Sequence, residues 1–277
     1  MKIALIQQRA ARDKQLNIAR GLANLEAAAR KGAALACYAE LAFEWFHPQH
    51  PAAGDIRSLA EPLDGPLVRA FRDKAREHGI VAVLNLFERQ GDATFDSSPV
   101  IDADGTLLGV TRMVHITEYA CFHEQGYYAP GDTGAPVFRT RAGNVGVAIC
   151  YDRHFPEYMR ALALAGADLV LVPQAGAVGE WPEGLYEGEM RVAAFQNGYY
   201  VALCNRVGQE DRLEFSGESF VCAPDGAVIT RAGRGTEEIL YAEVDLASTA
   251  ESHARQLFLR HRRPELYEEW FTHARNH

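Results

Sequence analysis

Cys150 is the residue whose surroundings point most strongly to chemistry. It ends an apolar run that is predicted to be a strand, and Pro156, which suits the first turn of a helix, follows closely. A thiol between a strand end and a helix start lies where backbone N–H groups and the helix dipole favour the nucleophilic thiolate. The alternative is that Cys150 is a small buried hydrophobic residue, as lone cysteines commonly are.

Two glutamates occupy positions that suit acid–base chemistry. Glu40 lies within the apolar stretch 34–43, where burying an unpaired carboxylate is costly and where apolar surroundings tune a general base. Glu124 lies in the long loop 122–132, and loops of this kind frequently carry function. The alternatives are a strand end emerging into solvent for Glu40 and a solvated loop carboxylate for Glu124.

Three histidines and one basic run give weaker signals. His115, His123 and His154 suggest a metal site, but no H-E-x-x-H or comparable ligand spacing is present, so no metal is predicted. The run of arginine and histidine at 260–263 is interpreted as a solvated or subunit-contacting segment rather than a nucleic-acid site.

The elements that must position these residues alternate between strands and helices. The predicted strands are Ile3–Ile6, Ala34–Leu41, Ile80–Phe87, Val145–Tyr151, Leu169–Val172, Tyr200–Cys204 and Ile239–Val244. Helices are predicted from about 16 to 31, and over Pro66–Glu77, Pro156–Ala165 and Tyr186–Asn197. Asp-Gly pairs predict hairpins over Val100–Ile116 and Ser219–Thr230, so the sheets must be mixed. The basic, aromatic segment Arg260–Trp270 is predicted to be a packed extension.

Composition limits the class of protein. The 277 residues are 48% hydrophobic and 23% charged, which is typical of a globular chain, and one α/β domain accounts for the alternation most simply. A net charge of −9 argues against nucleic acid or an anionic membrane as the main partner. No apolar run approaches a membrane span, and the first eight residues are too short an apolar stretch for a signal peptide. Five sparse cysteines without a C-x-x-C motif make a disulfide scaffold and a structural zinc site unexpected, and the chain is predicted to be cytoplasmic.

Together these segments resemble the nitrilase superfamily of carbon–nitrogen hydrolases over almost the whole chain. The family carries a Glu–Lys–Cys triad, in which Glu40 matches the glutamate after the second strand. Cys150 matches the cysteine of the Cys-Tyr-Asp…Phe-Pro-Glu motif, and Glu124 matches a second glutamate before Tyr-(Phe/Tyr)-x-Pro-Gly. The ending Arg-Pro-Glu-Leu-Tyr at 263–267 also resembles family tails.

The chain departs from the family at the lysine. The run 112–116 fits Arg-Lys-x-His-Ile, with Met113 where the amine is expected, and no lysine follows Lys74. Alternation along a strand would place Met113 and His115 on one face and Arg112 on the other, so His115 is the better substitute. In the family this lysine stabilises the oxyanion, whereas methionine donates no hydrogen bond. Losing one such donor costs about 10²–10³ in rate, so activity is expected to be impaired.

The resemblance implies a reaction and a class of substrate. Cys150 would attack a carbonyl carbon with Glu40 as general base, and water would then release the thioester. The backbone N–H of Tyr151 would supply part of an oxyanion hole, and Glu124 would orient the amide nitrogen or the base. The motifs look most like those of N-carbamoyl amino acid and amine hydrolases, with short aliphatic amides also open. Arg153 is expected either to pair with a substrate carboxylate or to form a structural ion pair.

The resemblance also implies the fold and the assembly. It implies an α-β-β-α sandwich of two mixed sheets flanked by helices, in one domain over residues 1–277, without a cofactor. Residues 246–277 would be a C-terminal extension packing at a subunit interface of a homodimer or larger homo-oligomer. A second hypothesis is that Met113 marks a non-catalytic or substrate-trapping relative, which binds an amide or carbamoyl ligand without turning it over.

Overall fold

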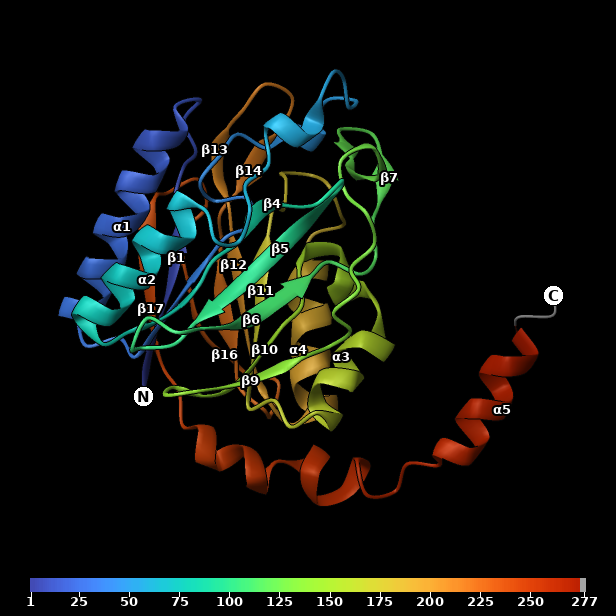
Figure 1. The fold of residues 1–277 in the computed structure, drawn as a ribbon. Coiled ribbons are helices and arrows are strands. Elements are labelled where there is room, and N and C mark those ends of the chain that lie inside the picture. The colour runs from blue at the N-terminus through green and yellow to red at the C-terminus, as the bar shows by residue number, and fades with distance from the viewer. Residues whose placement is uncertain (275–277) are drawn as a thin grey trace.

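Two mixed sheets form the centre of the molecule (Figure 1). The computed structural model describes residues 1–274, with side chains to residue 272. The first sheet has the order β17 (Glu238–Glu243), β1 (Lys2–Gln7), β2 (Leu35–Tyr38), β3 (Val81–Val83), β5 (Ala93–Ile101) and β4 (Leu86–Gln90), with β6 (Leu107–Arg112) also paired to β5. The second has the order β16 (Val228–Arg231), β15 (Phe220–Cys222), β12 (Tyr200–Asn205), β11 (Leu169–Gln174), β10 (Gly143–Val147) and β9 (Val137–Thr140).

Each sheet is apolar on both faces because it lies between its partner sheet and a pair of helices. In β1, Ile3 and Leu5 enter the core between the sheets, whereas Ala4 and Ile6 enter a second core beneath α1 (Lys14–Arg30) and α2 (Pro66–His78). The same alternation along β11 fills a third core beneath α3 (Pro156–Leu164) and α4 (Leu185–Asn197). The predicted sandwich of two mixed sheets flanked by helices is confirmed, and Figure 1 shows the helix pairs on opposite outer sides.

Local sequence signals set the ends of these helices. The Asp13 side chain accepts hydrogen bonds from the first turn of α1, and prolines at the first positions of α2 and α3 supply preset helical φ angles. Gly79 and Gly198 end α2 and α4 with φ angles of 64° and 71°, in the left-handed region that glycine adopts without strain. The predicted helix boundaries therefore differ from the observed ones by only a residue or two.

One predicted strand is interrupted. The run Ile80–Phe87 forms β3 and β4, which keep the same register against β5, because Ala82 faces Ile101 and Leu86 faces Ser97. Leu84 in the gap donates its N–H to the carbonyl of Pro99, but Pro99 has no N–H to return. The prediction of one continuous strand is wrong at this point, since hydrophobic periodicity does not reveal which residue faces a proline.

Three other strands are shorter than predicted, and each shortening affects the candidate site. β2 ends at Tyr38, so Glu40 lies in a turn, and β10 ends at Val147, so Cys150 opens a 3-10 helix over Cys150–His154. β6 ends at Arg112, so strand alternation does not extend to Met113 and His115 as predicted. Two small antiparallel ribbons, β7 (Glu118–Tyr119) with β8 (Phe122–His123) and β13 (Val207–Gln209) with β14 (Glu214–Ser216), edge this end of the sandwich.

The C-terminal segment leaves the body of the molecule. After β17 the chain forms short helical turns over Leu246–Glu251 and Ala254–Phe258, and α5 (Pro264–Ala274) then projects outward (Figure 1). The Trp270 and Phe271 side chains are each 57% exposed. These aromatic side chains are therefore exposed in the single chain, and packing of this segment at a subunit interface stays a prediction. None of the helices among the described residues is both long and apolar enough to cross a membrane.

Candidate active site

The Cys150 thiol lies just after β10 of the second sheet, at the start of the 3-10 helix Cys150–His154. The residue has a φ of 41° and is only 5% exposed. Left-handed backbone is strained for a residue with a side chain, and such strain concentrates at functional positions. Gln174, the last residue of β11, donates from Nε2 to Sγ over 3.3 Å, and Arg153 Nη1 donates to the Cys150 carbonyl over 3.0 Å. Gln174 therefore contacts the thiol from β11, and Arg153 contacts the backbone of Cys150 from within the same 3-10 helix.

The Glu40 carboxyl approaches the thiol from the first sheet. It is fully buried in the turn after β2. The Leu41 N–H donates to Asn85 Oδ1 over 2.6 Å, and Asn85 Nδ2 donates to Asp96 Oδ1 over 2.6 Å, which ties the turn to β5. Neither Glu40 oxygen has a hydrogen-bond partner of good geometry, yet the Cys150 thiol and the Asp96 carboxyl lie close enough to lower the pKa of Glu40. Base and nucleophile therefore meet between the two sheets.

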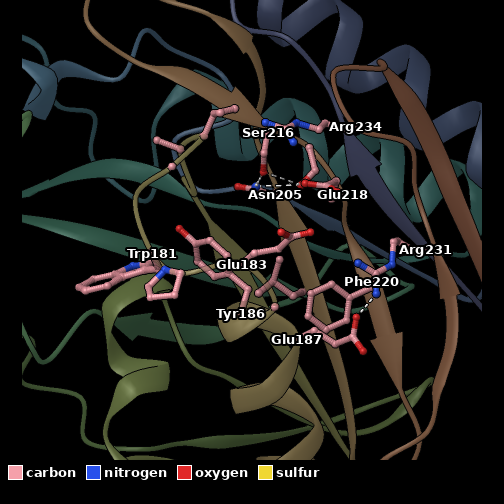
Figure 2. A pocket seen from close by; sticks show the side chains of 17 residues that line it. Trp181, Glu183, Tyr186, Glu187, Asn205, Ser216, Glu218, Phe220, Arg231 and Arg234 are labelled. Carbon is pink, nitrogen blue, oxygen red and sulfur yellow. Dashed lines mark hydrogen bonds and ion pairs between the residues drawn. The ribbon is translucent and has the colours of Figure 1, made fainter.

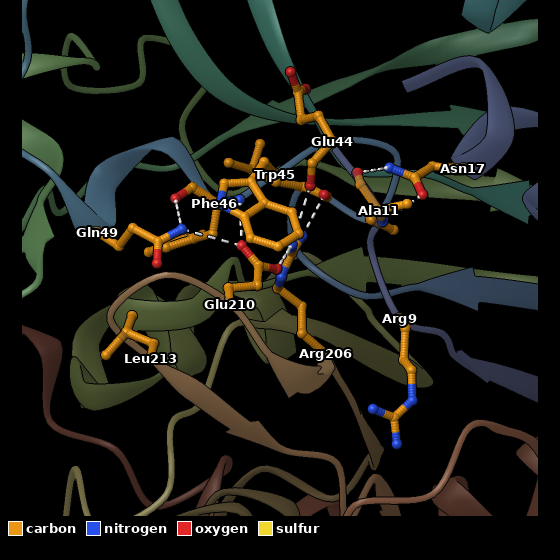
Figure 3. A network of polar contacts seen from close by, with 12 residues as sticks. Arg9, Ala11, Asn17, Glu44, Trp45, Phe46, Gln49, Arg206, Glu210 and Leu213 are labelled. Carbon is orange, nitrogen blue, oxygen red and sulfur yellow. Dashed lines mark hydrogen bonds and ion pairs between the residues drawn. The ribbon is translucent and has the colours of Figure 1, made fainter. Parts of the chain in front are cut away.

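Buried Arg206 holds the turn that carries Glu40 in place. Figure 3 shows this arginine beside Glu44 and Glu210. Arg206 Nη1 donates to the carbonyls of Glu40 and Leu41, and Nη2 donates to the carbonyl of Glu44 over 3.0 Å. Its charge is balanced by Glu210, whose other oxygen accepts from the Phe46 N–H over 2.9 Å. The turn that carries the candidate base is thus anchored by one side chain of the second sheet's loop.

Two more carboxyls complete the group around the thiol. Glu124 is fully buried at the start of a short 3-10 helix, Glu124–Gly126, and its charge acts on both Cys150 and Glu40. Asp96, in β5, is fully buried beside Glu40. Met113 is 1% exposed in the same intersheet core as Cys150. The site therefore gathers three carboxyls and a thiol, and the neutral side chain of Met113 lies in the same core as the thiol.

Burial and mutual repulsion keep these groups protonated. Burial first, and then the negative charge of Glu124, raises the pKa of Glu40 to about 8. Burial also raises the pKa of Asp96 and Glu124 well above the usual carboxyl range. The pKa of Cys150 rises strongly, through burial and then through the charges of Glu40 and Glu124. The expectation of a favoured thiolate is wrong, because burial among carboxyls outweighs the helix N-terminus and the charge of Arg153.

The other predicted site residues lie around this group. Arg112 is bound to Glu88 and Asp132. His115 Nδ1 lies 2.7 Å from Asp152 Oδ1, and its ring stacks on Phe155.

Tyr151 and Arg153 follow Cys150 in the same 3-10 helix. Tyr151 is half-buried in the first turn of the 3-10 helix, where backbone N–H groups lack helical acceptors. Arg153 Nε lies 3.4 Å from a Glu189 oxygen, and its guanidinium covers the Tyr186 ring. The geometry corresponds to the ion-pair alternative for Arg153.

The three histidines do not meet. His115, His123 and His154 each pair with a different carboxylate, of Asp152, Glu118 and Glu189. Across residues 1–274, no three His, Cys, Asp or Glu side chains come together in a way that could hold a metal ion.

A hollow of about 560 Å³ lies beside the site (Figure 2). Trp181, Tyr186 and Arg231 line it, whereas Cys150, Glu40 and Glu124 do not. The reactive groups are buried and do not line this hollow, whereas Tyr186 at its wall lies against Arg153, which binds the Cys150 carbonyl.

Sequence reasoning missed four residues of this site, namely Asn85, Asp96, Gln174 and Arg206. Asp96 carried a usable signal, since it is an acidic residue in a β-rich run, as Glu40 was. Asn85, Gln174 and Arg206 carried none, because their partners are distant in sequence.

Comparison with known proteins identifies the family. A model described as carbon–nitrogen hydrolase matches residues 2–254. The chain belongs to the carbon–nitrogen hydrolase family. An N-carbamoylputrescine amidase of Solanum lycopersicum is 33% identical, covering 98% of this chain and 94% of its own. A citrullinase of Francisella tularensis is 32% identical, covering 97% of each. The resemblance noted in the sequence is thereby confirmed.

Solved structures agree in fold. A carbon–nitrogen hydrolase from Helicobacter pylori G27 superposes with a TM-score of 0.91 at 29% identity, over 98% of both chains. An amidase from Nesterenkonia sp. gives 0.82 at 28% identity, over 98% of this chain and 96% of its own. Variants of that amidase have been solved with acrylamide or an acetamide moiety attached at the active-site cysteine.

The pH dependence of turnover should report on the Glu40–Asp96 pair. If ionised Glu40 is the base, kcat/KM rises with pH through about 8, the raised pKa of Glu40. The Asp96 carboxyl beside Glu40 lowers the pKa of Glu40, so Asp96→Ala should move this limb to higher pH. Asp96→Asn keeps a polar side chain of the same shape there and should leave the limb in place. Identical pH profiles for the Ala and Asn variants would contradict this arrangement.

Proposed function

We propose that this chain hydrolyses a linear amide or N-carbamoyl compound through a thioester on Cys150. The observation that carries the proposal is the meeting of a strained, buried thiol with the unpartnered Glu40 carboxyl. The family and the cysteine adducts of the Nesterenkonia amidase variants support it. N-carbamoyl substrates are favoured by the amidases named among the relatives.

Each protein group has a role in this mechanism. Glu40 takes the thiol proton as Cys150 attacks the carbonyl carbon, and it returns the proton to the departing ammonia or amine. Because the pKa of Cys150 is raised, the proton leaves during attack rather than beforehand. The Tyr151 N–H faces the oxyanion, and Glu124 orients the amide nitrogen. Water then releases the acyl or carbamoyl group, with Glu40 again as the base.

Replacing the nucleophile tests the proposal directly. Cys150→Ala should abolish ammonia release from a panel of N-carbamoyl amines, N-carbamoyl amino acids and short amides. Cys121→Ala, which removes a half-buried thiol outside the site, should leave release unchanged. Glu40→Gln incubated with fluoroacetamide should gain the mass of an acetamide group that the double variant with Cys150→Ala does not gain. Turnover by the Cys150→Ala protein would refute the assignment.

A non-catalytic role is the second candidate, and the buried, neutral Met113 is the observation that favours it. A protein of this kind would bind an amide or carbamoyl ligand in calorimetry and release no ammonia from it. Cys150→Ala would then leave the binding intact.

The exposed α5 suggests how the chain assembles. We propose that residues 246–277 contact a second copy, because Trp270 and Phe271 find no core in their own chain. Light scattering should therefore give a mass of at least twice 30.6 kDa, and Trp270→Glu should lower it, whereas the equivalent change at exposed Leu108 should not. A monomeric mass would contradict this proposal. We also propose a cytoplasmic location, which five free thiols support.

A further inference from the structure

The site around Cys150 is rich in buried oxygens that have no hydrogen-bond partner of good geometry. The buried oxygens without a partner are Glu40 Oε1 and Oε2, Glu124 Oε1 and Oε2, Asp96 Oδ2 and Gln174 Oε1. All four side chains are at most 1% exposed, so water does not supply the missing donors freely. Leaving buried polar atoms unpaired destabilises a fold, and such atoms call for an explanation.

Two of the three nearby cations are turned to other partners. Arg206 donates to the carbonyls of the Glu40 turn and to Glu210, and Arg112 binds Glu88 and Asp132. Arg153 donates from Nη1 to the Cys150 carbonyl, whereas its Nε and Nη2 are buried without a hydrogen-bond partner. Met113 contributes no N–H. Carboxyl and amide oxygens therefore outnumber the cations around the thiol, and Arg153 is the cation whose charge acts on it.

We propose that this acceptor set takes the cationic carbon of an amidinium or guanidinium group, so that the chain hydrolyses amidines or guanidines as well as amides. The inference rests on the proposed function, because it uses the same thiol and base. The two amino groups of an amidinium supply N–H donors, which match the unpaired carboxyl oxygens. Its positive charge also favours ionised Glu40 and Glu124, whose pKa values burial raises.

The chemistry of addition makes the missing amine unnecessary for such a substrate. Attack on a neutral carbonyl creates an oxyanion, which needs a donor or a positive charge nearby. Attack on an amidinium carbon cancels the substrate's charge and leaves neutral amino groups. A site that has methionine in place of lysine is therefore handicapped for the carbonyl and not for the amidinium.

The steps balance without any further reactant. Glu40 takes the thiol proton while the C–S bond forms, and then returns it as one C–N bond breaks and ammonia leaves. The product on the enzyme is a protonated thioimidate. Water attacks this carbon and the C–S bond breaks, which regenerates the thiol and releases the amide. The remaining proton converts ammonia to ammonium.

Matched pairs that differ only at the reacting carbon test this inference. Ammonia release would be measured for acetamidine against acetamide and for methylguanidine against methylurea. We expect kcat/KM for the cation to exceed that for the neutral partner by about 10²-fold, the typical penalty for a missing oxyanion donor. Met113→Lys should reverse the preference, because an ammonium repels the cation and stabilises the oxyanion. Met113→Leu, which stays neutral, should keep it.

The outcomes separate the two proposals. Faster turnover of acetamide than of acetamidine by the unaltered chain, or an unchanged preference in Met113→Lys, would overturn this inference and leave the proposed function standing. Ammonia from neither member of either pair, with no release from the N-carbamoyl and amide panel, would overturn both. Calorimetry of Cys150→Ala should also detect acetamidinium binding with proton release. Binding of acetamide alone would count against the acceptor site.

Discussion

Met113→Lys should raise kcat/KM for amides and N-carbamoyl compounds by about 10²–10³, the cost typical of one missing oxyanion donor. The side chain at 113 lies in the intersheet core with Cys150, and the prediction assumes that an amine there reaches the carboxyl groups around the thiol. It would also lower the pKa of Glu40 and Glu124 by adding a positive charge beside them. Ammonia release from the same substrate panel, measured for both proteins across pH, provides the check.

A matched variant separates charge from shape in this experiment. Met113→Gln places a neutral donor in the same space, so it should recover only part of the gain. Rates for Met113→Lys at or below those of the unaltered chain would contradict the prediction, provided that its unfolding free energy remains within about 1 kcal/mol. The existing donors would in that case already stabilise the oxyanion without an amine.

Arg206→Met should lower the free energy of unfolding by about 3–5 kcal/mol, the usual cost of breaking a buried ion pair. Arg206 is 2% exposed, and its loss removes its hydrogen bonds to Glu210 and to three carbonyls of the Glu40 turn and leaves the Glu210 charge without its cation. Urea unfolding followed by circular dichroism measures the change. Turnover should fall as well, because the arginine charge lowers the pKa of Glu40 and its removal keeps the base protonated to higher pH.

Two controls accompany this variant. Arg212→Met changes an exposed arginine six residues away and should alter stability by no more than about 0.5 kcal/mol. Adding Glu210→Gln to Arg206→Met removes the unpaired charge and should restore part of the loss. An Arg206→Met protein as stable as the Arg212→Met protein would show that the turn does not depend on this anchor.

The elements of the fold were predictable because their signals are local. Continuous apolar runs mark strands such as β1, and prolines, glycines and Asp13 mark helix ends within a few residues of the feature itself. The gap between β3 and β4 was not predictable, because it depends on Pro99 lying opposite Leu84 across the sheet.

The site was predictable only in part, for the same reason. Glu40, Glu124 and Cys150 stand out through the motifs that carry them. The residues that hold them depend on contacts across the fold, as Arg206 meets the carbonyl of Glu40 although 166 residues separate them. The raised pKa of Cys150 likewise depends on burial among carboxyls from distant segments, which no local pattern contains.

Glu40 follows β2 of the first sheet, and Cys150 follows β10 of the second. This arrangement has a mechanical consequence. Their alignment is set by how the two sheets pack, so the intersheet core acts as the spacer of the reacting pair. A cavity made there, even far from the thiol, would let the sheets slide and would disturb proton transfer between the two groups. An equal cavity beneath α1 and α2 would weaken the fold but leave the spacing intact. Tolerance to mutation in this chain should therefore differ between the cores, with turnover more sensitive than stability in the central one.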